Sequence, residues 1–217
     1  MDHETTMRKT LLLIVVVFLM SAAAFAQTSG NITVTGTTPE AFSITDTTDG
    51  TVTSSIVLGT LTPSNNGTLA QNTAQVRLRS NKAYKVTAQA SALNFSNAGS
   101  VDGGAALALT DVGFGITNIS AAGANVATGH SDTIATGYDV SGGWPTPANG
   151  LTPTFGKTLN DITTGVQVLN GTRISARGNL ATTNNFVLVT FGAATLPQFF
   201  TPNTGFSTTI TLTISGN

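Results

Sequence analysis

The feature that most constrains this chain is an alternation of apolar and polar residues with a period of two. The alternation is clearest in residues 208–214, where isoleucines and a leucine alternate with threonines. Successive side chains of a strand point to opposite faces, so this pattern predicts a strand with one face on a core. Because Thr and Ile are both β-branched, both also favour extended backbone.

Similar patterns recur along the chain, each followed by a Gly- or Asn-rich turn signal. We expect strands at residues 31–35, 42–44, 56–58, 76–79, 84–89, 114–116, 166–168, 186–191 and 208–214. The continuous apolar run at 56–58 predicts a strand buried on both faces. No segment after residue 26 shows helical periodicity. The expected fold is all-β, an immunoglobulin-like or jelly-roll β-sandwich in a single domain.

The N-terminus has the pattern of a secretory signal peptide. A basic pair at residues 8–9 precedes an apolar run at 11–20, and an Ala-Phe-Ala exit ends at Ala26. A retained membrane anchor is the alternative, but the run has only half of the roughly 20 residues that cross a bilayer. We therefore expect residues 1–26 to be removed and the protein to be exported, to the cell surface or beyond. Residues 1–6 are interpreted as an extension before the true start at Met7.

The remaining chain is unusually poor in charge. Charged residues make up 9% of the sequence and the net charge is −1, against about 25% charged residues in typical globular domains. A weakly charged surface does little to oppose self-association, and without a basic excess it does not favour nucleic acid as a partner. The chain contains no cysteine, so burial and hydrogen bonds must hold it together.

The residues give little basis for catalysis. His130 is the single histidine after the signal peptide, and it stands in a His-Ser-Asp tripeptide. Members of a catalytic triad converge from separated positions, and the chain has no G-x-S-x-G elbow. Residues 46–50, Asp-Thr-Thr-Asp-Gly, are interpreted as a turn rather than a calcium loop. We expect no enzymatic activity, no metal and no cofactor.

A cluster of basic residues is a candidate contact surface for a partner subunit: Arg77, Arg79, Lys82 and Lys85. The alternative interpretation is a solvated strand face. If this segment formed a tight hairpin, Arg79 would lie opposite Lys85, and like charges directly opposite are destabilising. Either the two strands belong to different sheets, or an acidic group covers the cluster.

The segment 121–156 is rich in Gly and Pro and is expected to form long loops or a small insertion. It contains Trp144 in the sequence Gly-Gly-Trp-Pro-Thr-Pro. This tryptophan is a candidate for stacking on a sugar or a partner protein. The alternative is that Trp144 caps one end of the core.

Three motifs in order resemble the spore coat U-like and chaperone–usher pilin group. They are Ile-Val-Leu-Gly-Thr-Leu-Thr-Pro at 56–63, Ser-Asn-Lys-Ala-Tyr at 80–84, and Gly-Phe-Ser-Thr-Thr leading into the last strand at 205–215. The resemblance implies an incomplete immunoglobulin-like fold that a strand from a neighbouring subunit completes. It also implies a homopolymer, with a periplasmic chaperone or usher as a further partner.

Residues 27–37 are the candidate donor strand, because Ile32 and Val34 alternate with threonines near a weakly charged end. The alternative is that this segment is the first strand of its own sheet, ahead of the sandwich at 38–217. Our leading hypothesis is a secreted, pilin-like structural subunit of an extracellular filament or surface layer. The second is a secreted adhesion module that binds glycans through Trp144.

Overall fold

A computed structural model describes residues 32–63, 67–95, 106–122, 124–145, 147, 153–178, 184–200 and 205–217. The expected signal peptide and residues 27–31 lie outside the described residues. The chain divides into two units, Met1–Thr38 and Pro39–Asn217. In the first unit, the described residues 32–38 form no strand, and the side chains of Ile32 and Val34 are 91% and 90% exposed.

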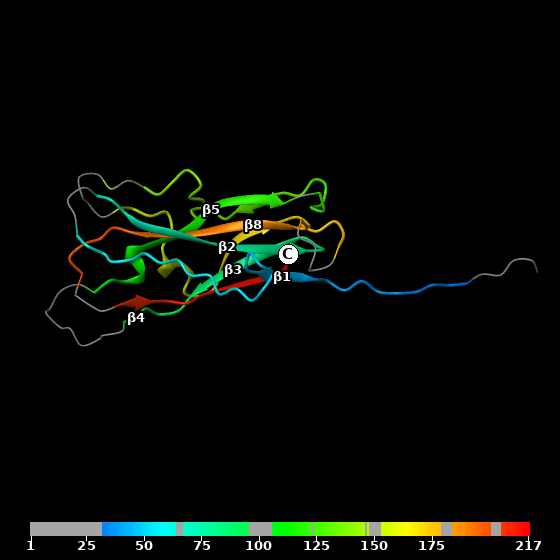
Figure 1. Ribbon diagram of the computed structural model, residues 1–217, viewed down its shortest axis with the longest axis horizontal. Coiled ribbons are helices and arrows are strands. Elements are labelled where there is room, and N and C mark those ends of the chain that lie inside the picture. Colours follow the sequence, from blue (N-terminus) through cyan, green and yellow to red (C-terminus); the bar gives the residue numbers. More distant parts are fainter. Residues whose placement is uncertain are drawn as a thin grey trace, which may run out of the picture. The chain divides into compact units, whose positions relative to one another are not determined.

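The second unit is a sandwich of two four-stranded antiparallel sheets (Figure 1). The first sheet has the order β1 (Phe42–Thr45), β2 (Ala70–Ser80), β8 (Phe186–Thr195), β5 (Val112–Ala122). The second has the order β10 (Ile210–Gly216), β3 (Tyr84–Ala90), β7 (Val166–Gly171), β6 (Asp132–Ile134). A further short pair joins β4 (Asn94–Phe95) to β9 (Phe206–Ser207), and the described residues include the 3-10 turns η1 (Leu109–Asp111) and η3 (Leu159–Ile162). The described residues form no α-helix, so the prediction of an all-β sandwich is confirmed.

The core lies between the sheets and follows the alternation in the sequence. The residues expected to share one face of residues 76–88 are all buried: Val76, Leu78, Tyr84, Val86 and Ala88. The rings of Phe114 and Phe191 stack with their centroids 5.9 Å apart, which ties β5 to β8 beneath the second sheet. Burial of alternate side chains from both sheets is the main driving force for this fold.

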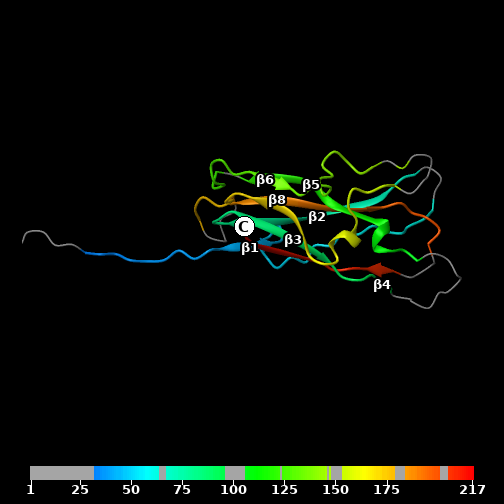
Figure 2. The ribbon, with the colours of Figure 1, turned by 180° about the vertical axis from the view of Figure 1, so that it is seen from behind.

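The strand order matches most of an immunoglobulin sandwich. The order β1-β2-β8-β5 follows the A-B-E-D order of that fold, and the neighbours β3 and β10 take the places of its strands C and F. In an immunoglobulin sandwich a strand G pairs with the outer edge of F. Among the described residues, no strand occupies that place beside β10. Beyond β3 the second sheet continues with β7 and then β6, and β6 is labelled in the view from behind (Figure 2).

The prediction of a doubly buried strand at 56–58 is wrong. Residues 51–63 form no strand, and Val57 is 62% exposed. Ile56 and Leu58 pack against the core. The side chain of Asn72 in β2 donates from Nδ2 to the Val57 carbonyl at 2.9 Å, and the Ser54 hydroxyl donates to the Gln75 carbonyl of β2. The apolar run therefore forms an extended segment that covers the core from one side only.

The strands β2 and β3 belong to different sheets, so Arg79 and Lys85 do not face each other. The connection between them passes from one sheet to the other at Asn81. The side chain of Asn81 accepts a hydrogen bond from the Ala41 N–H at 2.8 Å and donates one to the Pro39 carbonyl at 2.9 Å. These bonds hold the start of β1 beside the turn.

Candidate functional site

An apolar cleft opens between the two sheets at the edge where β10 lies. Its volume is about 650 Å³. Core side chains of β2, β5 and β8 line it, among them Val76, Phe114 and Phe191. Residues 52–59 form one wall and residues 205–210 belong to the other. The cleft therefore reaches the hydrophobic core along this edge, although Val76, Phe114 and Phe191 are each at most 4% exposed.

Unpaired strand edges lie on both sides of the cleft. The strand β1 pairs with only Arg77–Ser80 of β2. Beside residues 70–76 the described chain has no strand, only the extended segment 51–63, which hydrogen bonds of Ser54 and Asn72 join to β2. The outer edge of β10, opposite β3, also pairs with no strand among the described residues. An open edge beside apolar pockets is the surface to which an extended peptide adds as a strand, with alternate side chains entering the pockets.

The candidate donor residues Ile32 and Val34 lie in the first unit. Ile32 and Val34 are almost fully exposed and alternate with Thr33 and Thr35 in extended backbone. They pair with no strand among the described residues of their unit. Donation of this segment to a neighbour stays a prediction.

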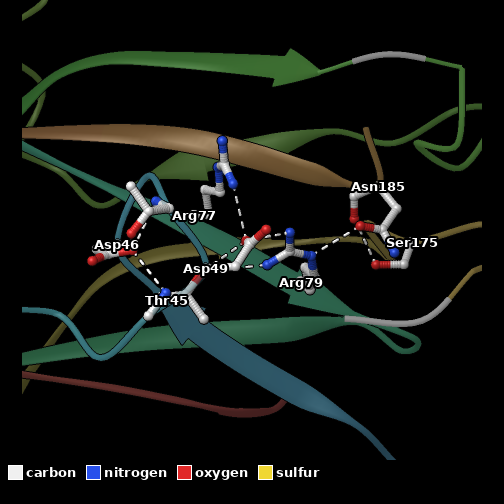
Figure 3. Close-up of polar contacts among 9 residues, drawn as sticks. Thr45, Asp46, Asp49, Arg77, Arg79, Ser175 and Asn185 are labelled. Carbon is white, nitrogen blue, oxygen red and sulfur yellow. Dashed lines mark hydrogen bonds and ion pairs between the residues drawn. The ribbon is translucent and has the colours of Figure 1, made fainter. Parts of the chain in front are cut away.

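The structure places an acidic group over the basic cluster (Figure 3). Asp49 Oδ1 lies 3.0 Å from Arg77 Nη1 and 2.7 Å from Arg79 Nη2. Arg79 is only 3% exposed, and its Nε donates to Asn185 Oδ1 at 2.9 Å. Both guanidinium groups also lie over the ring of Phe186, at 4.3 and 5.2 Å from its centroid. The hydrogen bond from Arg79 lowers the pKa of the Asp49 carboxyl.

A tight turn aims Asp49 at the two arginines. Asp46 Oδ1 accepts hydrogen bonds from the N–H groups of Thr48 and Gly50, each at 2.8 Å. A further bond from the Thr48 hydroxyl, together with these, lowers the pKa of Asp46. Asp49 itself has a φ of 68°, in the left-handed region. The acidic residues of 46–50 thus serve turn chemistry and an ion pair, and the described residues contain no group of three or more metal-ligating side chains.

The other two basic residues lie nearer the surface. Lys82 pairs with Glu40 in an exposed contact, and Lys85 is half-buried on β3, opposite Ser215 of β10. Since Arg77 and Arg79 are paired with Asp49 inside the subunit, a contact with an acidic partner depends on Lys82 and Lys85. That contact stays a prediction.

The side chains of His130 and Asp132 are in contact in the structure. The sequence analysis did not predict a contact between residues so close together in the chain. Residues i and i+2 of an extended chain share one face, and His130 Nε2 lies 2.9 Å from Asp132 Oδ2. The Tyr84 hydroxyl donates to the other carboxylate oxygen, and burial raises the pKa of Tyr84, with a further contribution from Asp132. The closest contact of His130 Nδ1 is the Arg173 carbonyl, at 3.2 Å. The network ties together β3, β6 and the end of β7.

Trp144 lies outside the buried core cluster. It is half-buried, and its ring stands edge-to-face with Phe155, 5.8 Å between centroids at 88°. A pocket of about 350 Å³ lies beside it. The interpretation of Trp144 as a cap on the core is therefore not what the structure shows.

Comparison of the chain with protein-family models, with curated proteins and with solved structures finds no match. Within the described ranges, no helix has the length and apolar character needed to cross a membrane. The function is therefore inferred from the geometry and the sequence.

Proposed function

We propose that this protein is a secreted structural subunit of an extracellular filament or surface layer, and that it assembles by β-strand complementation. The observation that carries the proposal is the apolar cleft beside β10, which Val76, Phe114 and Phe191 help to line and where no described strand pairs with the outer edge of β10. A strand from a second copy would insert alternate side chains into this cleft and pair with the free edge of β10.

The donor and the acceptor lie on different parts of the chain, so the contact is heterologous. A heterologous contact repeats from copy to copy and builds a ring or an open filament. Burying Ile32 and Val34 would each contribute about 1.5–3 kcal/mol, and backbone hydrogen bonds to β10 would add to this. The near-zero net charge removes a long-range repulsion between copies.

Export and the sequence resemblance support the same proposal. A signal peptide at residues 1–26 would deliver the chain to the compartment where such filaments form. Two of the motifs that resemble pilins lie at the cleft. Residues 56–59 of the motif at 56–63 form part of one wall, and the motif at 205–215 contains most of β10 on the other side.

The test is electron microscopy of residues 27–217 beside a chain that begins at residue 39. We expect filaments or ordered layers from the longer chain and dispersed particles from the shorter one. The Ile32→Asp/Val34→Asp double variant should also fail to assemble, because it would bury charge without a partner.

The matched control is Thr33→Asp/Thr35→Asp, which adds the same charge to the opposite face of the segment. It should still assemble, and circular dichroism should show the same sheet content in all variants. Assembly that survives Ile32→Asp/Val34→Asp, or dispersed particles from the unmodified chain, would refute strand complementation by this segment.

A further inference from the structure

Three glycines, Gly113, Gly115 and Gly192, lie close together on the outer face of the first sheet, away from the cleft. Gly115 of β5 is the cross-strand partner of Gly192 of β8, and Gly113 is two residues away on β5. A Cβ on Gly113 would come within 2.4 Å of the Phe155 ring, and one on Gly192 within 3.2 Å of Trp144. The two aromatic rings therefore lie directly on the sheet at positions that a larger residue would fill.

The pocket beside Trp144 is built from three parts of this face. Gln71, Asn72 and Thr73 come from β2, and Thr117 comes from β5. The loop with Val140, Ser141 and Gly143 closes the side next to Trp144. At about 350 Å³ the volume falls within the range of small-molecule sites.

Some polar groups of the pocket already form hydrogen bonds within the protein, and others remain available to a ligand. Asn72 is held in place, since Nδ2 donates to the Val57 carbonyl and Oδ1 accepts the Thr73 N–H at 2.8 Å. The Thr117 hydroxyl donates to the Thr190 carbonyl at 3.2 Å and keeps its acceptor capacity. The side chain of Gln71 makes no hydrogen bond to the residues that the structure describes, so its amide can serve a ligand.

None of the described lining residues is charged. The pocket thus combines one large aromatic surface with uncharged amides and hydroxyls. A neutral sugar has the complementary chemistry, because its ring has an apolar face of C–H groups and a rim of hydroxyls that both donate and accept. Anionic sugars, phosphates and acidic peptides would find no cation here.

We propose that this pocket binds a neutral carbohydrate, with the sugar ring against Trp144 and its hydroxyls bonded to Gln71 and Thr117. The site lies on the outer face of the first sheet, whereas the assembly cleft opens between the sheets. The proposal is thus independent of the filament proposal. A subunit that does both would display sugar-binding sites along a polymer.

The test uses the fluorescence of Trp144, which is the single tryptophan of the chain and so reports on this pocket alone. The probes are four neutral hexasaccharides: cello-, xylo-, manno- and chito-hexaose. We expect a saturable change in Trp144 emission with at least one of them, with a micromolar to millimolar dissociation constant confirmed by calorimetry.

Gln71→Ala should weaken this binding about tenfold, the loss expected of one hydrogen bond. Gln75→Ala is the matched control, because Gln75 lies on the same face of β2 but outside the pocket. It should leave the affinity unchanged. Gln71 is exposed at the rim, so its replacement should not disturb folding.

Four results would overturn the proposal. The first is the absence of a saturable signal with any of the four probes, and the second is an unchanged affinity in Gln71→Ala. The third is equal weakening in Gln75→Ala. The fourth is a saturable response to a proline-rich peptide, or to a sulfated sugar, that none of the neutral hexasaccharides produces.

Discussion

At the scale of single residues, two buried tyrosines differ in whether the hydroxyl group has a hydrogen-bond partner, and this difference should change how much each contributes to stability. Tyr84 is fully buried and its hydroxyl donates to Asp132. Tyr138 is 2% exposed, and its hydroxyl has no hydrogen-bond partner in the part of the chain described. Burial raises the pKa of both hydroxyls. A buried hydroxyl without a partner costs free energy that a phenyl ring does not.

The two Tyr→Phe variants should therefore have opposite effects. Tyr84→Phe should lower the free energy of unfolding by about 1–2 kcal/mol, since it removes the hydroxyl that donates to Oδ1 of the half-buried Asp132 and leaves only the contact of Oδ2 with His130. Tyr138→Phe should raise it by about 1 kcal/mol. Urea denaturation measures both, and a loss of stability in Tyr138→Phe would contradict the assignment of an unpartnered hydroxyl.

Asp49 gives a residue-level prediction for pH. Its pKa is lowered from 3.8 by Arg79, so the carboxylate stabilises the folded state above the unfolded pKa, and this contribution is lost as pH falls through the folded pKa. Asp49→Asn, which tolerates the positive φ, should lose about 2 kcal/mol at neutral pH because Arg79 stays buried without its carboxylate.

The difference between Asp49→Asn and the unmodified protein should shrink below pH 3.8 and vanish once Asp49 is protonated in the folded state. Urea denaturation across the acid range measures it. Asp139→Asn is the comparison variant: hydrogen bonds from Ser141 lower the pKa of this exposed carboxyl without an ion pair, so the loss at neutral pH should be smaller than in Asp49→Asn. A loss in Asp49→Asn that stays constant down to strongly acidic pH would argue against the ion pair.

At the scale of elements, close packing decides where glycine is required. Residues 170–171, Asn-Gly, have the composition of a turn, yet they end β7. A Cβ on Gly171 would lie 2.5 Å from Asp132 Oδ1 and 2.7 Å from the ring of Tyr84. This glycine serves the close approach of three strands rather than a turn.

The close contact between Gly113 of β5 and Phe155 can be tested by substitution. Gly113→Ala should displace Phe155 and cost about 1–3 kcal/mol through overpacking. Because Phe155 packs against Trp144, the emission maximum of Trp144 should shift as well. Gly142→Ala, where a Cβ would meet nothing within 4 Å, should change neither quantity. If Gly113→Ala changed neither the stability nor the emission maximum, the ring of Phe155 would not pack against this strand.

At the scale of the whole molecule, the proposed strand complementation would make stability depend on a second chain. A ligand that binds only the folded state stabilises it in proportion to the logarithm of its concentration. The sandwich of residues 39–217 alone should therefore be less stable than the assembled protein, because the cleft beside β10 would lack the donated strand.

A synthetic peptide of residues 27–37 should therefore raise the melting temperature of a chain that begins at residue 39 by several degrees at saturation. A peptide with Asp in place of Ile32 and Val34 should have no effect. Differential scanning fluorimetry measures the shift. Equal shifts with both peptides would mean that apolar side chains do not enter the cleft.

The sequence by itself determined the fold class and much of the core. Side-chain alternation is a local property, so the inward faces of β2, β3 and β8 could be predicted from adjacent residues alone. The turn at 46–50 could be predicted for the same reason, because its hydrogen bonds join residues at most four positions apart.

Only the tertiary structure decided which strands pair and what lies over them. The assignment of β2 and β3 to different sheets, the ion pair of Asp49 with Arg79, and the contact of Tyr84 with Asp132 join residues far apart in sequence. The cleft beside β10 is also a tertiary property, since it exists because no described strand pairs with that edge. Local pattern sets how each strand faces, whereas the energy of long-range packing selects its neighbours.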